Sequence, residues 1–545
     1  MSTAARRTLS WWLLASLPLA FLGTFFLWPL GSVLVHGLFD GGFDAAGTWA
    51  VVTDSRTADA VVTTLGLAAA GTAGSLVLGL SGAYVLYRLR WRGQRAVRAI
   101  VGVPFVLPTI VVASAFSALL GRSGPLGFLG LDQSVVAIAA ALVFYNVSVV
   151  VRVVGGAWAA LDPATASAAR TLGADRRRVV AHVTLPALAP AIASAAAVVF
   201  LFCATSFGVV LVLGGTRVRT LETEIYLQVN QFLDLRAAAV LSILQMLVVA
   251  LVLWLSAAAR RRRERAVGGR AVDGTRPFRA ADAWVAVPTA LTLGTLLALP
   301  LYSLVERSLR TTDGYGLDYY AALFTQPGRT VLPVSVAQAA LNSLVTAAIA
   351  AGVACVIGQL VATLLTRRSR RAGVLDAVVM LPLGVSAVVV GLGMLLTLNQ
   401  PVLGIDLSGS WWLVAAAQAV VALPLVVRTM VPPARAIDPR LRAAASALGA
   451  SPWRVWARVD WPLLRRPFGL AVGFAFAISL GEFGATSFVA RPDRPTLPTA
   501  IFRLLGRPGA ESVGMAFAAA VVLAVMTGAI MMVAERMRTD VGGDL

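Results

Sequence analysis

The sequence contains no lysine, so all 46 of the residues counted as lysine or arginine are arginine. A phosphate-binding P-loop of the form G-x-x-x-x-G-K-[ST] depends on a lysine that reaches the terminal phosphates of the nucleotide. The chain therefore lacks such a loop. Any ATP hydrolysis coupled to it must occur in a partner protein, which would also bind the ATP and its magnesium.

Charged residues, cysteines and histidines are also scarce. Only 13% of the residues are charged, and there are two cysteines and two histidines. Cys203 and Cys355 lie far apart within apolar runs, so no disulfide framework or metal site is indicated. His182 has no cluster of cysteines or carboxylates at ligand spacing, and no set of acid, base and nucleophile stands out. We therefore predict no catalytic residues, no metal site and no cofactor in this chain.

Apolar residues are abundant instead. They make up 58% of the chain, and the mean hydropathy is +0.81, far above that of a soluble domain. A transmembrane helix needs roughly 20 consecutive apolar residues. Runs of this kind lie near residues 11–33, 60–87, 97–120, 132–158, 186–213, 236–258, 283–306, 335–365, 374–398, 411–432, 467–490 and 513–534. We predict an all-α integral membrane protein with about 12 transmembrane helices.

The arginines lie between these runs and predict the orientation in the membrane. The net charge of +20 could suggest nucleic acid, but the arginines form no soluble basic domain. The positive-inside rule places arginine-rich connections in the cytoplasm. Two such connections follow the second and sixth runs and contain Arg88, Arg90, Arg92, Arg95, Arg98, Arg260, Arg261, Arg262 and Arg263. The acidic connection after the first run should be external, so both termini of this multi-pass protein of the cell membrane are predicted to be cytoplasmic.

Over a long stretch the second half of the sequence repeats the first at a constant spacing along the chain, which we call the repeat offset. Upstream of this stretch, where Thr64 aligns with Ser343, the spacing is slightly larger. Equivalent pairs include Arg152 and Arg428, Gly173 and Gly449, and Pro186 and Pro462. Because each half has six predicted spans, an even number, the halves form parallel repeats. We predict a first half at 1–257, a linker at 258–282 and a second half at 283–545. The arginine- and glycine-rich linker is expected to be a flexible cytoplasmic tether, or to bind anionic headgroups of the membrane lipid, or both.

The connection between the fourth and fifth runs carries a repeated motif. Residues 161–186 read LDPATASAARTLGADRRRVVAHVTLP, and residues 437–462 read IDPRLRAAASALGASPWRVWARVDWP. In each copy an aspartate N-cap, a proline at the first helical position and a closing glycine predict a short helix. A second helix should follow, capped by Asp175 or Ser451, and Pro186 or Pro462 should open the next span. One face of the short helix should carry small and apolar residues suited to docking, namely Ala164, Ala168 and Leu172, or Leu441, Ala445 and Leu448.

The segment from Ser167 to Pro186 resembles the E-A-A coupling motif of binding-protein-dependent ABC importer permeases, and the segment from Ala443 to Pro462 repeats it. The resemblance covers nearly the whole chain and implies the type I ABC importer permease fold in two parallel six-helix repeats. It also implies two ATPase subunits and an extracytoplasmic substrate-binding protein as partners. Residues implied in ATPase coupling are Asp162, Ser167, Ala168, Ala169, Gly173, Pro186, Asp438, Ala443, Ala444, Ala445, Gly449 and Pro462. The family's leading glutamate is replaced by Ser167 and Ala443, and Trp461 stands where leucine is usual.

The fused two-half layout is most similar to permeases for thiamine or ferric iron, through residues 203–226 and 479–502. Sulfate and molybdate permeases share a stretch close to G-E-F-G-A-T, so that substrate class stays an alternative. A secondary transporter with two six-span halves is a further alternative, although it would not need two docking helices.

The resemblance places four residues near the translocation pathway, namely Ser206, Phe207, Glu482 and Phe483. Glu482 lies in an apolar run, where an ionisable group is costly unless it faces a cavity or a partner. Two other interpretations are that it lies near the external headgroups or caps a helix break at Gly481 and Gly484. Breaks in the third run of each half, which help helices flex, are suggested by Pro104, Pro108 and Pro382.

Overall fold

The computed structural model describes residues 3–39, 42, 44–215, 217–261, 275–311, 314–325, 332–366, 370–398 and 410–539. The elements of the first half are α1 (Thr3–Leu22), η1 (Gly23–Leu27), α2 (Trp28–Phe39), α3 (Ala45–Thr53), α4 (Ser55–Ala83), η2 (Tyr84–Arg88), β1 (Leu89–Arg90), α5 (Gln94–Gly102), η3 (Val103–Phe105), α6 (Thr109–Leu120), η4 (Gly127–Leu129), α7 (Val135–Ala159), α8 (Pro163–Thr171), α9 (Arg176–Val179), η5 (Val180–Thr184), α10 (Leu185–Ala204), α11 (Phe207–Gly214), α12 (Leu221–Asn230) and α13 (Leu235–Arg261).

The later elements are β2 (Arg276–Pro277), η7 (Ala280–Asp282), α14 (Ala283–Leu309), β3 (Arg310–Thr311), β4 (Gly314–Tyr315), α15 (Asp318–Ala322), α16 (Val336–Leu365), α17 (Arg370–Met380), η8 (Leu381–Gly384), α18 (Ala387–Leu398), α19 (Trp411–Ala436), α20 (Pro439–Ala447), α21 (Pro452–Val455), η9 (Trp456–Asp460), α22 (Trp461–Gly481), α23 (Thr486–Val489), α24 (Leu497–Leu505) and α25 (Ala510–Thr539).

Among the described residues, ten helices are long and apolar enough to span a membrane, and two bent pairs raise the number to twelve. The pairs are the third predicted spans of the two halves, which are broken as their prolines suggested. Gln94–Phe105 meets Thr109–Leu120 at 98°, and Arg371–Gly384 meets Ala387–Leu398 at 99°. Pro104, Pro108 and Pro382 lie at these bends, where a missing N–H donor interrupts the helix. The two six-helix repeats are confirmed when each bent pair is taken as one span.

The sequence repeat extends to irregular local structure. The helices α8, α9 and α12 begin one repeat offset before α20, α21 and α24, and the π-helices η5 and η9 have the same spacing. Each π-turn is followed by one residue and then by Pro186 or Pro462. Proline cannot donate its backbone hydrogen bond and its ring crowds the preceding turn, which a π-turn can accommodate. Helix α10 therefore continues from α9 through η5, and Pro186 and Pro462 lie within a continuous helix instead of opening it.

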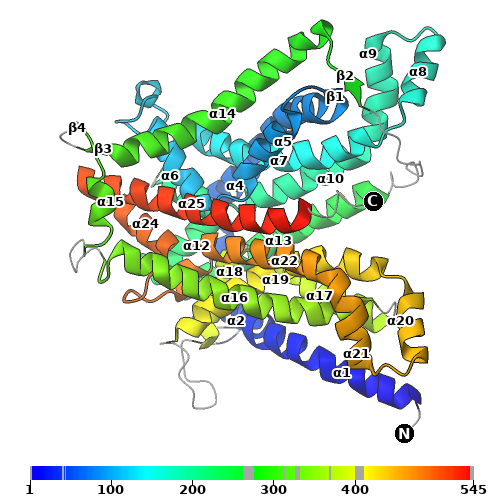
Figure 1. Ribbon diagram of the computed structural model, residues 1–545. Coiled ribbons are helices and arrows are strands. Elements are labelled where there is room, and N and C mark those ends of the chain that lie inside the picture. The colour runs from blue at the N-terminus through cyan, green and yellow to red at the C-terminus, as the bar shows by residue number, and fades with distance from the viewer. Residues whose placement is uncertain are drawn as a thin grey trace.

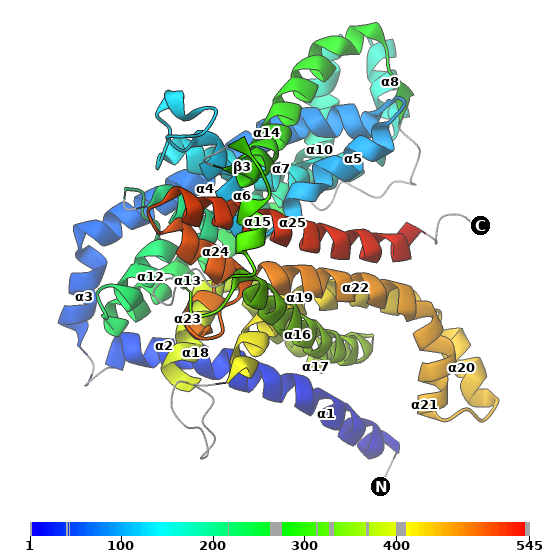
Figure 2. The ribbon, with the colours of Figure 1, turned by 60° about the vertical axis from the view of Figure 1, so that its left-hand side comes forward.

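The first helices of the two halves lie across the other half. Helices α1 and α2 pack against α16 and α18 of the second half, and α14 packs against α4 and α6 of the first, while α2 and α14 also contact α13 and α25 of their own halves. Trp11 and Leu22 accordingly lie in a core made mostly of second-half residues, and Leu293 and Leu297 of α14 lie in a core made otherwise of first-half residues. Both views show α1 beside the second half and α14 beside the first (Figures 1 and 2). The two sequence repeats are therefore interlocked in space.

One end of the molecule carries both copies of the repeated loop. Helices α8 and α9 and helices α20 and α21 project from the same end, where α1 begins and α25 ends (Figures 1 and 2). We call this the motif end. Arg88 of η2, which follows α4, lies there too, since it lines one cavity with Ser167 and Arg170 of α8. Helices α3, α15 and α24 lie at the opposite end.

The last part of the predicted linker is attached to the first half. Residues 262–274 lie outside the described part of the chain. Beyond them, β2 pairs in parallel with β1, and the Arg276 guanidinium bonds Asp282 at 2.5 and 2.8 Å and the Tyr84 hydroxyl at 2.7 Å. Residues 276–282 are thus held against the first half instead of forming part of a free tether.

Candidate functional site

The repeated loops form the short capped helices that the motif predicts. The Asp162 carboxylate accepts a hydrogen bond from the Ala164 amide at 2.8 Å, and Asp438 accepts one from the Arg440 amide at 2.9 Å. Prolines occupy the first helical positions. Gly173 and Gly449 close the helices with φ of +85° and +80°, a conformation that side-chain-bearing residues adopt reluctantly.

The outward face of each short helix is small and apolar. Leu172 and Leu448 are 88% and 89% exposed. Ala164 and Ala168 are exposed with Leu172, as predicted. In the second copy Ala444, the counterpart of Ala168, is exposed, whereas the predicted Ala445 is half-buried like its counterpart Ala169. The exposed stripe of α20 is therefore Leu441, Ala444 and Leu448.

In both loops, the residue that replaces the leading glutamate of the family motif is exposed. The Ser167 hydroxyl donates to the Pro163 carbonyl at 3.0 Å, and Ala443 offers no polar group. The second loop has a different internal contact, because the Arg442 guanidinium lies 2.8 Å from the Asp460 carboxylate. This pair ties α20 to the helix that continues into α22.

The fifth span of each half begins and ends earlier than predicted. The continuous helices are Arg177–Ala204 and Pro452–Gly481, so all four predicted pathway residues lie just beyond a span end. Ser206 precedes α11. Glu482 caps the next turn, accepting hydrogen bonds from the amides of Ala485 at 2.7 Å and Thr486 at 3.0 Å. Of the interpretations of Glu482, the capped helix break matches its contacts.

The two halves meet at a cluster of aromatic rings. Phe207 and Phe483, which are separated by the repeat offset, stack with ring centroids 5.4 Å apart and an interplanar angle of 20°. Tyr226 contacts Phe207 at 5.4 Å, and its counterpart Phe502 contacts Phe483 at 5.4 Å. Phe488 completes the group at 5.8 Å from Tyr226. We call these five residues the aromatic cluster. Because equivalent residues of both halves meet in it, the cluster lies on the pseudo-symmetry axis.

A buried carboxylate that the sequence analysis missed also joins the halves. Glu222 on α12 is fully buried and bonds the Gln245 amide at 3.1 Å and the Ser386 hydroxyl of the second half at 2.5 Å. Its counterpart in the second half is Pro498, so the contact has no symmetric equivalent. One sign of this contact was present in the sequence: the 203–226 segment contains a glutamate that the equivalent segment of the other repeat lacks.

Replacing Glu222 with leucine should separate its hydrogen-bonding role from its bulk. Leucine leaves Ser386 and Gln245 without this partner, so we expect the free energy of unfolding to fall by about 3 kcal/mol. Glu222→Gln retains hydrogen-bonding atoms and should cost less than half as much. Thermal unfolding of the purified variants in detergent measures both effects. Equal losses in the two variants would contradict the role of the cross-half contact.

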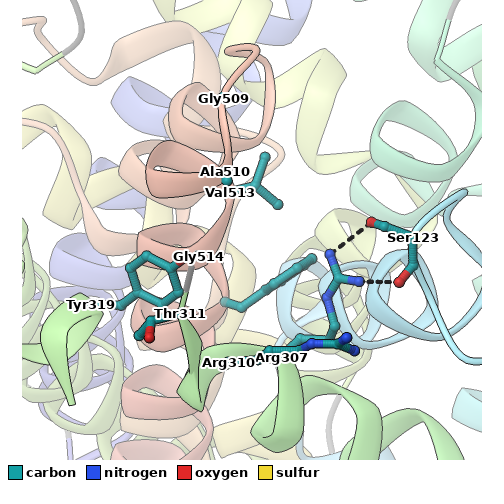
Figure 3. A pocket seen from close by; sticks show the side chains of 10 residues that line it. Ser123, Arg307, Arg310, Thr311, Tyr319, Gly509, Ala510, Val513 and Gly514 are labelled. Atoms are coloured by element: carbon teal, nitrogen blue, oxygen red, sulfur yellow. Dashed lines mark hydrogen bonds between the residues drawn. The ribbon is translucent and has the colours of Figure 1, made fainter. Parts of the chain in front are cut away.

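At the opposite end, a cavity of about 470 Å³ lies between α14, α15 and α25 and the first-half loop that holds Ser123 (Figure 3). The Arg307 side chain reaches across to Ser123 and donates to its backbone carbonyl and, at 2.8 Å, to its hydroxyl. The same guanidinium lies 5.8 Å from the ring centroid of Phe517. Arg307 thus holds the end of α14 against the first half, whereas Arg310 is exposed at the cavity edge.

Because of this contact, substituting Arg307 should lower the melting temperature more than substituting the neighbouring Arg310. Arg307→Gln removes the charge-assisted bonds to Ser123, so we expect the melting temperature to fall by about 1–2 °C. Arg310→Gln removes the same charge without a cross-half bond and should leave the melting temperature nearly unchanged. Parallel thermal scans compare the two, and equal shifts would count against the contact.

Known proteins match this arrangement along most of the chain. Residues 75–265 and 354–539 match the family described as binding-protein-dependent transport system inner membrane component. The thiamine transport system permease protein ThiP of Brucella suis is 27% identical over 537 residues, covering 95% of this chain and 94% of the relative. The protein of that name from Escherichia coli is 28% identical over 441 residues, covering 78% and 79%.

A solved structure of a bacterial alginate ABC transporter, in complex with a periplasmic protein bound to alginate pentasaccharide, aligns with a TM-score of 0.40 and 20% identity. It covers 47% of this chain and 96% of its own.

The family model matches each repeat separately and includes both capped loops. The chain therefore belongs to the binding-protein-dependent inner membrane components and is a permease subunit of an ABC importer.

Proposed function

We propose that this permease imports thiamine. One structural observation carries the transport mechanism: each exposed loop at the motif end is joined by one continuous helix to the aromatic cluster between the halves. The similarity to two permeases named for thiamine transport, over most of this chain, supports the substrate.

Membership of the family implies an ATPase and a substrate-binding protein as partners, and a place in the cell membrane as a multi-pass protein. We further propose that the motif end is cytoplasmic and that α8 and α20 each receive one ATPase subunit. The exposed Leu172 and Leu448 would be covered in that complex. Two identical ATPase subunits offer the same binding surface twice, which suits two equivalent helices. In this proposal the chain is non-catalytic, and the partner binds ATP and magnesium.

The helices after the loops supply the mechanical connection. Arg177–Ala204 has 28 residues, so at 1.5 Å per residue it reaches about 42 Å from the loop to the segment before Phe207. Pro452–Gly481 does the same before Phe483. When ATP draws the two ATPase subunits together, α8 and α20 move with them. The far ends of the two helices then shift and separate the stacked rings.

The aromatic cluster also fits the chemistry of thiamine. Thiamine carries a cationic thiazolium ring and a flat aminopyrimidine, and both can lie against aromatic faces. The Tyr226 side chain adds a hydroxyl group at the edge of the cluster. Ferric iron, sulfate and molybdate lack a ring system that would use these surfaces.

Uptake competition tests the substrate. Proteoliposomes containing the permease, its ATPase and its binding protein should accumulate labelled thiamine, and only unlabelled thiamine should compete. Ferric citrate, sulfate and molybdate serve as competitors for the alternatives. No accumulation of labelled thiamine, together with accumulation of labelled ferric citrate in the same proteoliposomes, would replace thiamine by iron as the substrate.

A further inference from the structure

Glu222 is a buried carboxylate with no positively charged partner among the described residues. Its two hydrogen bonds come from neutral groups, the Gln245 amide and the Ser386 hydroxyl. The buried Glu224 on the same helix differs, since the Arg219 guanidinium lies 3.6 Å from its carboxylate. A carboxylate away from water gains free energy when a positive charge reaches it. Glu222 can therefore still pair with a cation.

The local backbone favours the ionised form of this carboxylate. Glu222 lies in the first turn of α12, and the Ser386 hydroxyl caps α18 by accepting a hydrogen bond from the Val388 amide at 3.1 Å. The start of a helix carries a partial positive charge, so both helices favour a negative charge here. These partial charges hold the anion in place, but they leave it without a full countercharge.

The neighbouring Gln245 has a side-chain oxygen without a hydrogen bond. Its amide nitrogen donates to the Glu222 carboxylate at 3.1 Å and to the Ala204 carbonyl at 3.3 Å. Because both partners are acceptors, the nitrogen has to face them, and this fixes the orientation of the amide. The Oε1 atom is then buried with no partner in the described part of the chain. An N–H donor on a ligand would satisfy this oxygen.

These groups lie one helical turn from the aromatic cluster, where the two halves meet. Tyr226 of the cluster follows Glu222 by four residues on α12, so both side chains project from one face of the helix. Ala204 ends α10, which connects the first loop to the cluster. Ser386 belongs to the bend in the third span of the second half. Separation of the halves would therefore break the Glu222–Ser386 bond and uncover the carboxylate beside the aromatic rings.

We propose that Glu222 and Gln245 determine the specificity of the pathway for a cation that carries an N–H donor. When the halves separate, the Glu222 carboxylate pairs with the positively charged thiazolium ring of thiamine, and the Gln245 Oε1 atom accepts a hydrogen bond from its aminopyrimidine. The inference rests on the proposed transport of thiamine and names the residues that recognise it. Since the counterpart of Glu222 is Pro498, the carboxylate is contributed by the first half alone.

Uptake of labelled thiamine by proteoliposomes with the permease, its ATPase and its binding protein tests the proposal. Glu222→Gln keeps hydrogen-bonding atoms and removes the charge, so uptake should fall by about tenfold or more while ATP hydrolysis persists. The matched control Glu224→Gln removes a buried carboxylate from the same helix and should retain uptake. Melting temperatures of the purified variants in detergent show whether each permease is folded.

A relocated carboxylate provides a second variant. Glu222→Gln combined with Ser386→Asp moves the charge across the 2.5 Å contact to the second half, where aspartate also suits the cap of α18. This variant should recover about half of the lost uptake or more. No recovery in a folded double variant would overturn the proposal, as would equal uptake by Glu222→Gln and Glu224→Gln. Absence of thiamine uptake by the unsubstituted permease would instead overturn the proposed function, and this inference with it.

Discussion

The double variant Gly173→Val and Gly449→Val is expected to retain ATP hydrolysis by the partner ATPase while transport falls by about tenfold or more. Both glycines have positive φ, which costs a side-chain-bearing residue roughly 1–2 kcal/mol and more for a β-branched one. A Cβ at either position would meet no atom within 4 Å, so the effect comes from the backbone and not from crowding. The strained turn misdirects the helix that follows, and coupling fails. Simultaneous assays of ATP hydrolysis and uptake in proteoliposomes measure this loss of coupling.

Two controls isolate the turn. Gly173→Asn with Gly449→Asn should keep transport, because asparagine tolerates the left-handed conformation. Gly130→Val introduces similar strain at a loop with φ of +63°, also with no atom within 4 Å, outside the two repeated loops. It should leave coupling intact. Unchanged coupling in the double valine variant would contradict the docking role of the loops.

Removing the stacked pair with Phe207→Ala and Phe483→Ala should let substrate cross without ATP, at a rate raised by about tenfold or more. The two rings are buried at 5% and 2% exposure and fill the space where the halves meet. Their truncation leaves a void on the axis and costs about 3–5 kcal/mol of stability per ring. Efflux of preloaded thiamine from proteoliposomes lacking ATP is the measurement.

A second aromatic pair separates leakage from instability. Phe116 and Phe144 pack edge to face with ring centroids 5.7 Å apart within the first half, away from the contact between halves. Phe116→Ala with Phe144→Ala should reduce stability similarly without raising efflux. Equal efflux from the two double variants would show that the aromatic cluster does not close the pathway.

The sequence alone was sufficient to predict features of the structure that are local or that recur in both halves. The caps at Asp162 and Asp438, the closing glycines and the second caps at Asp175 and Ser451 all depend on residues within four positions of each other. The constant repeat offset then predicted that equivalent elements recur. These features follow from backbone geometry, which the side chains dictate directly.

Features that depend on long-range packing were not predictable. Pro104 and Pro382 indicated breaks in the third spans, but hydropathy could not show that the two parts of each span meet at nearly a right angle, since both parts are apolar. It also placed Glu482 inside a span that ends one residue earlier. Phe207 and Phe483 were selected as separate pathway residues. Their stacking depends on how the halves associate, and so does the contact of Glu222 with Ser386, which lies 164 residues away.

The exchange of first helices shows the same limit. Nothing in the sequence of α1 or α14 specifies that each packs against the other half, because an exposed apolar stripe can face either a neighbouring helix or lipid. The folded chain settles this by burying Trp11 with the second half and Leu297 with the first. The sequence repeats and the spatial halves therefore differ in their first helix.

ATP-driven uptake in a defined system tests the central claim most directly. Proteoliposomes are prepared with the permease, its ATPase and its binding protein, and thiamine accumulation is followed with ATP enclosed or omitted under fixed ion gradients. We predict accumulation only with ATP, and none when the permease carries Gly173→Val and Gly449→Val. Accumulation driven by a proton or sodium gradient without ATP would contradict the account.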